Sequence, residues 1–168
     1  MKIVVSPNPY RDKQFKNARQ ACSILREAGA EVALCLPFDV DKTFEIPHDL
    51  RFQDIQKEIK TADMLICFGG DGTILHSSKI ATEHNLPILG VNIGTMGFIA
   101  ELEAGEIELL RKIPKGDYTV EERTMLDVSV GNGRQTLFHE TALNDAVITK
   151  VAIVPSLKTP SGIIPSVY

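Results

Sequence analysis

Five consecutive residues, Gly69-Gly70-Asp71-Gly72-Thr73, have the types and the spacing for phosphate chemistry. Glycines allow the backbone to turn sharply and leave its N–H groups accessible to an anion. A carboxylate among such amides repels a bound phosphate unless it takes up a proton or shares a cation. We therefore predict that Asp71 is catalytic and accepts the proton of a hydroxyl that attacks a phosphoryl group.

The position of this segment in the chain supports a phosphate site. Residues 64–68 form a continuous apolar run that is typical of a buried strand, and a helical pattern follows Thr73 to about His84. The positive end of that helix would point at the glycines. A tight structural turn is the alternative for an isolated motif of this kind, but the strand before it and the helix after it favour the phosphate site.

A second glycine loop follows the next predicted strand. Residues 87–91 are expected to form that strand, and residues 92–97 (Asn-Ile-Gly-Thr-Met-Gly) form the loop. We expect Asn92 and Thr95 to shape this loop and to be able to contact a ligand, because the two glycines let the backbone come close. Both loops follow strands, so both should lie at the carboxyl edge of one sheet, where open α/β sheets bind ligands.

The elements around these loops alternate in type. We predict further strands at 2–6 and 31–36 and further helices at 13–28 and 52–59. This order indicates an α/β domain over residues 1–115, in which helices flank a parallel sheet.

The pattern changes in the last third of the chain. Residues 126–130 alternate apolar and polar side chains, residues 131–133 can turn the chain, and residues 136–149 look like a returning strand. We expect a β-rich second domain to start over residues 116–150. Residues 151–168 contain three prolines, and their apolar residues follow neither the helical nor the strand period. This predicts an irregular tail and an incomplete second domain.

Composition excludes several classes of function. The net charge of −4 gives no broad basic field, so binding to nucleic acid or to an anionic membrane is not expected. Cys22, Cys35 and Cys67 are isolated in apolar segments, which favours buried thiols in a reducing compartment over disulfides or metal ligands. No stretch has transmembrane length, and the apolar amino terminus is too short for a signal peptide, so we expect a cytoplasmic protein.

Two well-known phosphate-binding motifs are absent. The sequence contains no GxxxxGK[ST] run, and the second loop does not read GxGxxG. Neither a P-loop enzyme nor a Rossmann dehydrogenase is therefore indicated.

In their order, these motifs resemble the NAD kinases over about the first 150 residues. That family has a strand, a GGDGT loop and a helix, then a strand and a glycine loop similar to the one at 92–98. The later Leu143-Asn144-Asp145 is similar to the family's second motif, an Asn followed by an acidic residue. Three motifs in series are more specific than any one of them.

The resemblance implies a reaction and roles for the first loop. ATP would phosphorylate the adenosine ribose 2′-hydroxyl of NAD to give NADP, with a divalent metal, Mg²⁺, bridging the donor phosphates. Asp71 would accept the hydroxyl proton. Gly69, Gly70 and Gly72 would make room for phosphates, and Gly72 and Thr73 would also belong to the nucleotide site.

The resemblance also implies contacts outside that loop. His76 would touch the dinucleotide as a neutral hydrogen-bonding group, with a plain surface histidine as the alternative. Asn144 and Asp145 would bind the adenosine end of NAD, because a carboxylate suits the hydroxyls of ribose. A turn at the end of a strand is the alternative for that pair.

Other functions stay open at this point. Members of the family continue through a longer β-rich domain that carries a Thr-Pro-Thr-Gly-Ser segment, which Thr159-Pro160-Ser161-Gly162 matches only faintly. The chain could therefore be a truncated, non-catalytic nucleotide-binding module. Diacylglycerol and sphingosine kinases share the GGDGT loop, and 6-phosphofructokinases have a close relative of it, so a lipid or sugar kinase is a further alternative. Homo-oligomers are implied for the full-length family.

Overall fold

The computed structural model describes residues 1–94 and 97–147. It divides the chain into two compact units, Met1–Glu122 and Arg123–Tyr168, and each is described by itself.

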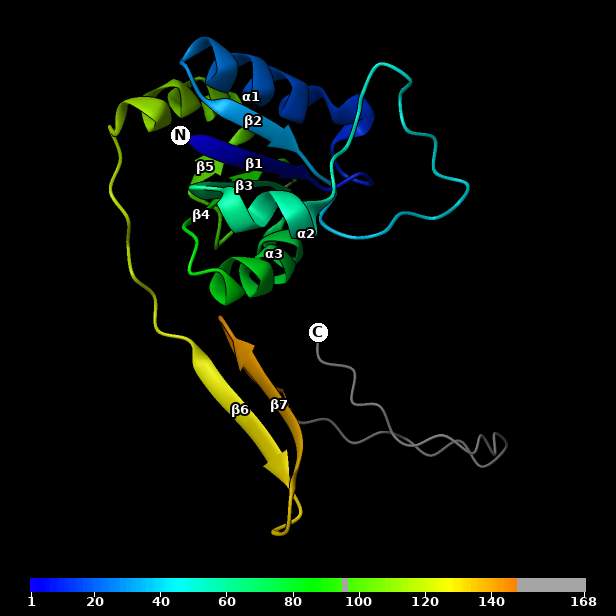
Figure 1. The fold of residues 1–168 in the computed structure, drawn as a ribbon, viewed down its shortest axis with the longest axis vertical. Helices are drawn as coiled ribbons and strands as arrows, with labels where there is room; N and C mark the ends of the chain where they lie inside the picture. The colour runs from blue at the N-terminus through cyan, green and yellow to red at the C-terminus, as the bar shows by residue number, and fades with distance from the viewer. Residues whose placement is uncertain (95–96, 148–168) are drawn as a thin grey trace. The chain divides into compact units, whose positions relative to one another are not determined.

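The first unit is built on a five-stranded parallel sheet (Figure 1). Its strands are β1 (Lys2–Pro7), β2 (Glu31–Leu34), β3 (Met64–Gly69), β4 (Ile88–Asn92) and β5 (Leu102–Glu103). They lie in the order β2-β1-β3-β4-β5, so β1 and β3 are central. Every residue of β3 is buried, as expected for a strand covered on both faces. The predicted α/β class with a parallel sheet is confirmed.

Helical segments cover both faces of this sheet. They are η1 (Lys13–Phe15), α1 (Lys16–Glu27), α2 (Ile55–Glu58), η2 (Ile59–Thr61), α3 (Asp71–Glu83) and η3 (Ala104–Lys115). In Figure 1, α1 and η3 lie on one side of the sheet and α2 and α3 on the other. Because side chains alternate along a strand, Ile3 and Val5 belong to the core under α1, whereas Val4 belongs to the core under α3.

The first long helix begins later than its sequence pattern predicts. Gln14 and Phe15 have φ angles of 54°, a left-handed backbone that interrupts the helix before α1. Asp12, only 1% exposed, stabilises the start of α1, because its carboxylate accepts hydrogen bonds from the backbone N–H groups of Asn17 at 3.0 Å and Ala18 at 2.9 Å. The loop after β1 therefore has a fixed end at Asp12.

The described part of the second unit is an antiparallel hairpin. Strands β6 (Leu126–Gly131) and β7 (Thr136–Ala142) pair, with an irregularity in register between Val130 and Gly131. The side-chain carbonyl of Asn132 accepts hydrogen bonds from the backbone N–H groups of Arg134 and Gln135 and so closes the turn. The predicted hairpin is present, although β7 ends at Ala142. The predicted tail, 151–168, lies outside the described residues.

The three cysteines are buried and free, as the sequence predicts. Burial raises the pKa of Cys22 to about 11 and those of Cys35 and Cys67 to about 12. Over residues 1–94 and 97–147 no group of three His, Cys, Asp or Glu side chains could hold a metal ion. Within the same ranges, no helix has the length and apolar character needed to cross a membrane.

Candidate active site

A cavity of about 480 Å³ lies at the carboxyl edge of the sheet, after β1, β3 and β4. Gly70, Gly72 and Thr73 line it from the first glycine loop, and Asn92 and Gly94 line it from the second. The predicted meeting of the two loops is thus present. The sheet brings them together because Gly69 pairs with Asn92 in the register of β3 and β4.

The glycines of the first loop differ in their surroundings. A methyl group built on Gly70 or Gly72 would meet no atom within 4 Å. A methyl group on Gly69 would lie 2.5 Å from Cβ of Thr73, and Gly69 does not line the cavity. Gly70 and Gly72 therefore leave room for a ligand, whereas Gly69 leaves room for the Thr73 side chain.

Asp71 joins the first loop to the segment that follows the second. Its half-buried carboxylate accepts hydrogen bonds from the backbone N–H of Phe98, at 3.1 Å to each oxygen, and from the backbone N–H of Ile99, at 3.2 Å to Oδ1. Asp71 is not among the residues that line the cavity. Because Oδ2 receives one of these bonds and Oδ1 receives two, Oδ2 keeps accepting capacity for a further proton.

Asn92 shapes the second loop with both ends of its amide. It is 1% exposed, its Nδ2 donates to both carboxylate oxygens of Glu103 at 2.9 and 3.1 Å, and its Oδ1 accepts from the backbone N–H of Gly94 at 3.0 Å. These contacts agree with the loop-shaping role expected for Asn92. Thr95, its expected companion, lies outside the described residues.

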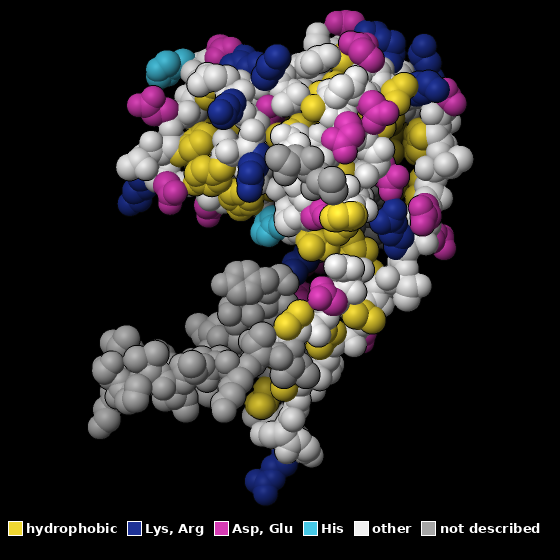
Figure 2. Space-filling model, turned by 180° about the vertical axis from the view of Figure 1, so that it is seen from behind, with side chains coloured by type: hydrophobic (Ala, Val, Ile, Leu, Met, Phe, Trp, Pro, Cys, Tyr) yellow, Lys and Arg dark blue, Asp and Glu magenta, His cyan; other side chains and the backbone are white. Residues whose placement is uncertain are grey.

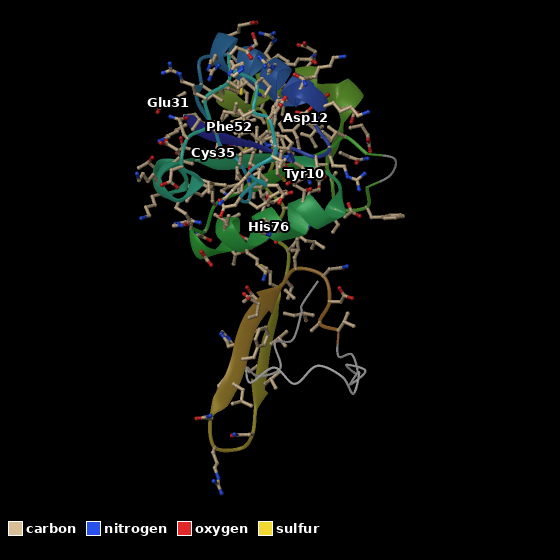
Figure 3. The ribbon with its side chains drawn as sticks, turned by 90° about the vertical axis from the view of Figure 1, so that its right-hand side faces the viewer. Tyr10, Asp12, Glu31, Cys35, Phe52 and His76 are labelled. Carbon is tan, nitrogen blue, oxygen red and sulfur yellow. The ribbon has the colours of Figure 1, made fainter. Side chains whose placement is uncertain are left out.

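His76 forms one wall of the cavity together with Phe38. Its Nε2 lies 3.0 Å from the carbonyl oxygen of Pro37, and its ring meets that of Phe38 edge to face at 5.7 Å. Because a carbonyl oxygen can only accept, Nε2 carries the proton, and in the neutral ring Nδ1 is the acceptor. Figure 3 looks at this edge and shows His76 on α3 and Tyr10 on the loop after β1.

The loop after β1 also contributes to the cavity, which the sequence did not indicate. Asn8 and Arg11 line it. The Asn8 side chain donates to Oγ1 of Thr73 at 2.8 Å, so this loop is attached to the first glycine loop. The available signal was topological, because β1 and β3 are neighbouring parallel strands whose carboxyl ends meet at one edge.

The remaining predicted residues belong to the second unit. Asn144 and Asp145 follow β7 and are exposed. They belong to the second unit, whereas the residues that line the cavity belong to the first. Thr159-Pro160-Ser161-Gly162 lies outside the described residues.

The surface outside the cavity has mixed charge. On the face drawn in Figure 2, acidic and basic side chains are interspersed and no field of one sign covers it. An anionic ligand would therefore be recognised locally.

Comparison with known proteins gives a family for this arrangement. A family model described as the ATP-NAD kinase N-terminal domain matches residues 3–118. The chain belongs to the NAD kinase family. It is 44% identical over 98 residues to the NAD kinase of Natranaerobius thermophilus, covering 58% of this chain and 34% of that protein. It is 35% identical over 152 residues to the NAD kinase of Caldanaerobacter subterraneus subsp. tengcongensis, covering 90% of this chain and 52% of that protein.

The fold has a counterpart among solved structures. The crystal structure of yeast NADH kinase complexed with NADH aligns with a TM-score of 0.60 and 19% sequence identity, over 84% of this chain and 46% of that chain. This likeness concerns the fold. The chain spans about half the length of that NADH kinase and of the Caldanaerobacter NAD kinase, and about a third of the Natranaerobius NAD kinase.

Proposed function

We propose that this chain carries the phosphoryl-transfer part of an NAD kinase, which uses ATP to phosphorylate the adenosine ribose 2′-hydroxyl of NAD and gives NADP and ADP. The observation that carries the proposal is the cavity into which the open backbone of Gly70 and Gly72 faces, next to the carboxylate of Asp71. The family match and the relatives named NAD kinase support the choice of substrates.

In this reaction the chain positions groups and moves one proton. The 2′-hydroxyl oxygen forms a bond to the γ-phosphorus, the bond from that phosphorus to the β,γ-bridging oxygen breaks, and ADP leaves. Asp71 takes up the hydroxyl proton as the new bond forms. The Phe98 and Ile99 amides hold the carboxylate in one orientation, and Oδ2 is the oxygen with capacity to accept.

Mg²⁺ enters this scheme as part of the substrate, bound to the phosphates of ATP. This fits the described part of the cavity lining, which includes no Asp or Glu, and the described residues contain no group of three metal-binding side chains. Phosphate oxygens and water would then supply most of the octahedral shell that Mg²⁺ requires.

Three further residues are proposed to bind the dinucleotide. His76 would contact it through Nδ1, since Nε2 is engaged with the Pro37 carbonyl. Asn144 and Asp145 would bind the adenosine end of NAD through amide and carboxylate hydrogen bonds. Both residues are exposed after the end of β7, which leaves their side chains accessible to a ligand.

An assay of NADP formation from NAD and MgATP, read by an NADP-specific dehydrogenase, tests the proposal on the full 168-residue chain. We expect ATP-dependent NADP. The controls replace NAD with diacylglycerol or sphingosine and follow ATP consumption, which would favour a lipid kinase if it occurred without NADP. Calorimetric binding of NAD without any turnover would instead favour a nucleotide-binding module and would contradict catalysis by this chain.

A further inference from the structure

Arg11 is a cation that faces the cavity and has no partner among residues 1–94 and 97–147. Among the described residues that line the cavity, it is the one Lys or Arg, and none of them is Asp or Glu. Within the described residues its guanidinium makes no hydrogen bond or ion pair, although Arg19 pairs with Asp49 and Arg111 pairs with Glu27. An unpaired guanidinium therefore faces a space that is otherwise lined by neutral groups and by His76.

The segment that carries Arg11 is anchored at both ends. At its start, the Asn8 backbone N–H donates to the carbonyl of Phe68 at 2.8 Å, and the Asn8 side chain donates to Thr73. At its end, the buried Asp12 carboxylate is bonded to the first turn of α1. Two further backbone bonds close the turn, because the carbonyl of Asn8 accepts from the N–H groups of Arg11 and Asp12 at 3.1 and 2.9 Å.

This anchoring fixes the backbone of Arg11 relative to the first glycine loop. Phe68 is the β3 residue just before Gly69, and Thr73 ends the loop, so Asn8 is bonded to both sides of it. A side chain carried by such a turn loses less entropy on binding than one carried by a free loop. The turn thus presents the positively charged guanidinium of Arg11 to the same cavity that Gly70 and Gly72 leave open.

We propose that Arg11 binds the β- and γ-phosphates of the phosphoryl donor, and this proposal rests on the function proposed above. A guanidinium fits two phosphate oxygens at once and keeps its charge at every physiological pH. It would offset charge on the diphosphate that becomes the leaving group, while the open amides of the glycine loop contact the same phosphates. Arg11 is in this sense a donor-binding residue separate from the proton acceptor Asp71.

The test replaces Arg11 and measures binding without requiring turnover. Calorimetric titration of the full chain with inorganic triphosphate, and then with MgATP, should show affinity that falls about 10- to 100-fold in Arg11→Gln, the range for loss of a charged hydrogen-bonded contact. Arg11→Lys should fall less, because it keeps the charge and loses the fork. Lys13→Gln is the matched control, since Lys13 is an exposed cation two residues away that does not line the cavity.

The outcomes separate this proposal from the proposed function. Weaker triphosphate binding in Arg11→Gln with an unchanged unfolding midpoint supports the Arg11 site even if the chain forms no NADP. NADP formation with an unchanged KM for ATP in Arg11→Gln overturns the Arg11 site and leaves the NAD kinase function standing. An equal loss in Lys13→Gln, or no triphosphate binding by the unaltered chain, also overturns the Arg11 site.

Discussion

The two glycine loops meet at the same cavity but are built in different ways. In the first, a methyl group on Gly70 or Gly72 would meet nothing within 4 Å. In the second, a methyl group on Gly97 would lie 3.2 Å from Cγ of Asn92 and 3.3 Å from Oδ1 of Asp71, and both polar ends of the Asn92 amide are hydrogen-bonded. The first loop is open toward the cavity, whereas the second is filled by its own contacts.

The difference assigns separate tasks to the two loops. A ligand needs backbone N–H groups that it can reach. A rigid supporting loop needs polar side chains that are already hydrogen-bonded within the protein. Asp71 connects the two tasks, because it starts α3 in the first loop and is held by the amides that follow the second. Removing the proton acceptor Asp71 should therefore affect turnover. Changing the packing at Gly69, the Asn92 support of the second loop or the buried Cys67 thiol should instead affect stability.

The largest effect is expected from Asp71→Asn. The amide oxygen can still accept hydrogen bonds from Phe98 and Ile99, but it cannot take up the hydroxyl proton, so kcat should fall by about 10²- to 10⁴-fold. NADP formation at saturating substrates measures the fall. Glu45→Gln, which changes an exposed carboxylate away from the cavity, serves as the control. Undiminished turnover in Asp71→Asn would exclude its role as the base.

The parts of this site that depend on local sequence were predictable. The buried run of β3, the glycines and the helix after them lie within twenty residues, so pattern and turn chemistry suffice to place Gly70, Gly72 and Thr73 at a sheet edge. The hairpin around Asn132 was predictable for the same reason, because alternation and turn residues are local.

Contacts between distant segments were not predictable. Asn8 meets Thr73 across 65 positions, and Phe98 meets Asp71 across 27, and no local pattern specifies either pairing. Arg11 looks like any exposed cation in the sequence, and only the anchored turn brings it to the cavity.

One element, η3, was not predicted although a signal for it exists. Its buried residues, Ile107, Leu110 and Ile113, recur every three positions, which fits the three residues per turn of a 3₁₀-helix and not the period of 3.6 of an α-helix. Glu103 and Glu106 also form a reciprocal capping box at its start. A search for period 3 would have located this helix.

A large effect on stability is expected from Gly69→Ala, with Gly70→Ala as its matched opposite. The new methyl group at 69 would displace Thr73 and break its bond to Asn8, which should lower the free energy of unfolding by about 1–3 kcal/mol. At position 70, where φ is −104°, alanine fits, and stability should stay the same or rise by about 0.4–1 kcal/mol.

For MgATP binding, Gly70→Ala should have the larger effect of these two glycine substitutions. The methyl group of Gly70→Ala projects where a donor phosphate is proposed to lie, so affinity for MgATP should fall about tenfold, while stability against urea should not fall. A Gly70→Ala protein that binds MgATP as tightly as the unaltered chain would show that the first loop does not receive phosphate.

An effect on stability of similar size should come from the support of the second loop. Asn92→Asp places a carboxylate where the Asn92 amide now donates to Glu103, and repulsion in this buried position should lower the free energy of unfolding by about 1–3 kcal/mol. Adding Glu103→Gln should recover most of the loss, because its amide can donate to the new carboxylate. If the double variant is as unstable as the single one, the Asn92–Glu103 contact does not support the loop.

An effect confined to alkaline pH is expected from Cys67 on β3, two residues before Gly69. Burial raises its pKa from 9.0 to about 12, so the folded chain keeps this proton above pH 9, where the unfolded chain begins to lose it. The unfolded state then binds fewer protons, and the free energy of unfolding should decrease as pH rises from 9 toward 12. Urea unfolding between pH 8 and 11 measures the slope.

In Cys67→Ala the decrease should be shallower, because Cys22 and Cys35, with pKa values of about 11 and about 12, still contribute. An equal slope in both proteins would mean that the Cys67 thiol has its ordinary pKa and that the strand behind the first loop is less tightly packed than its burial indicates.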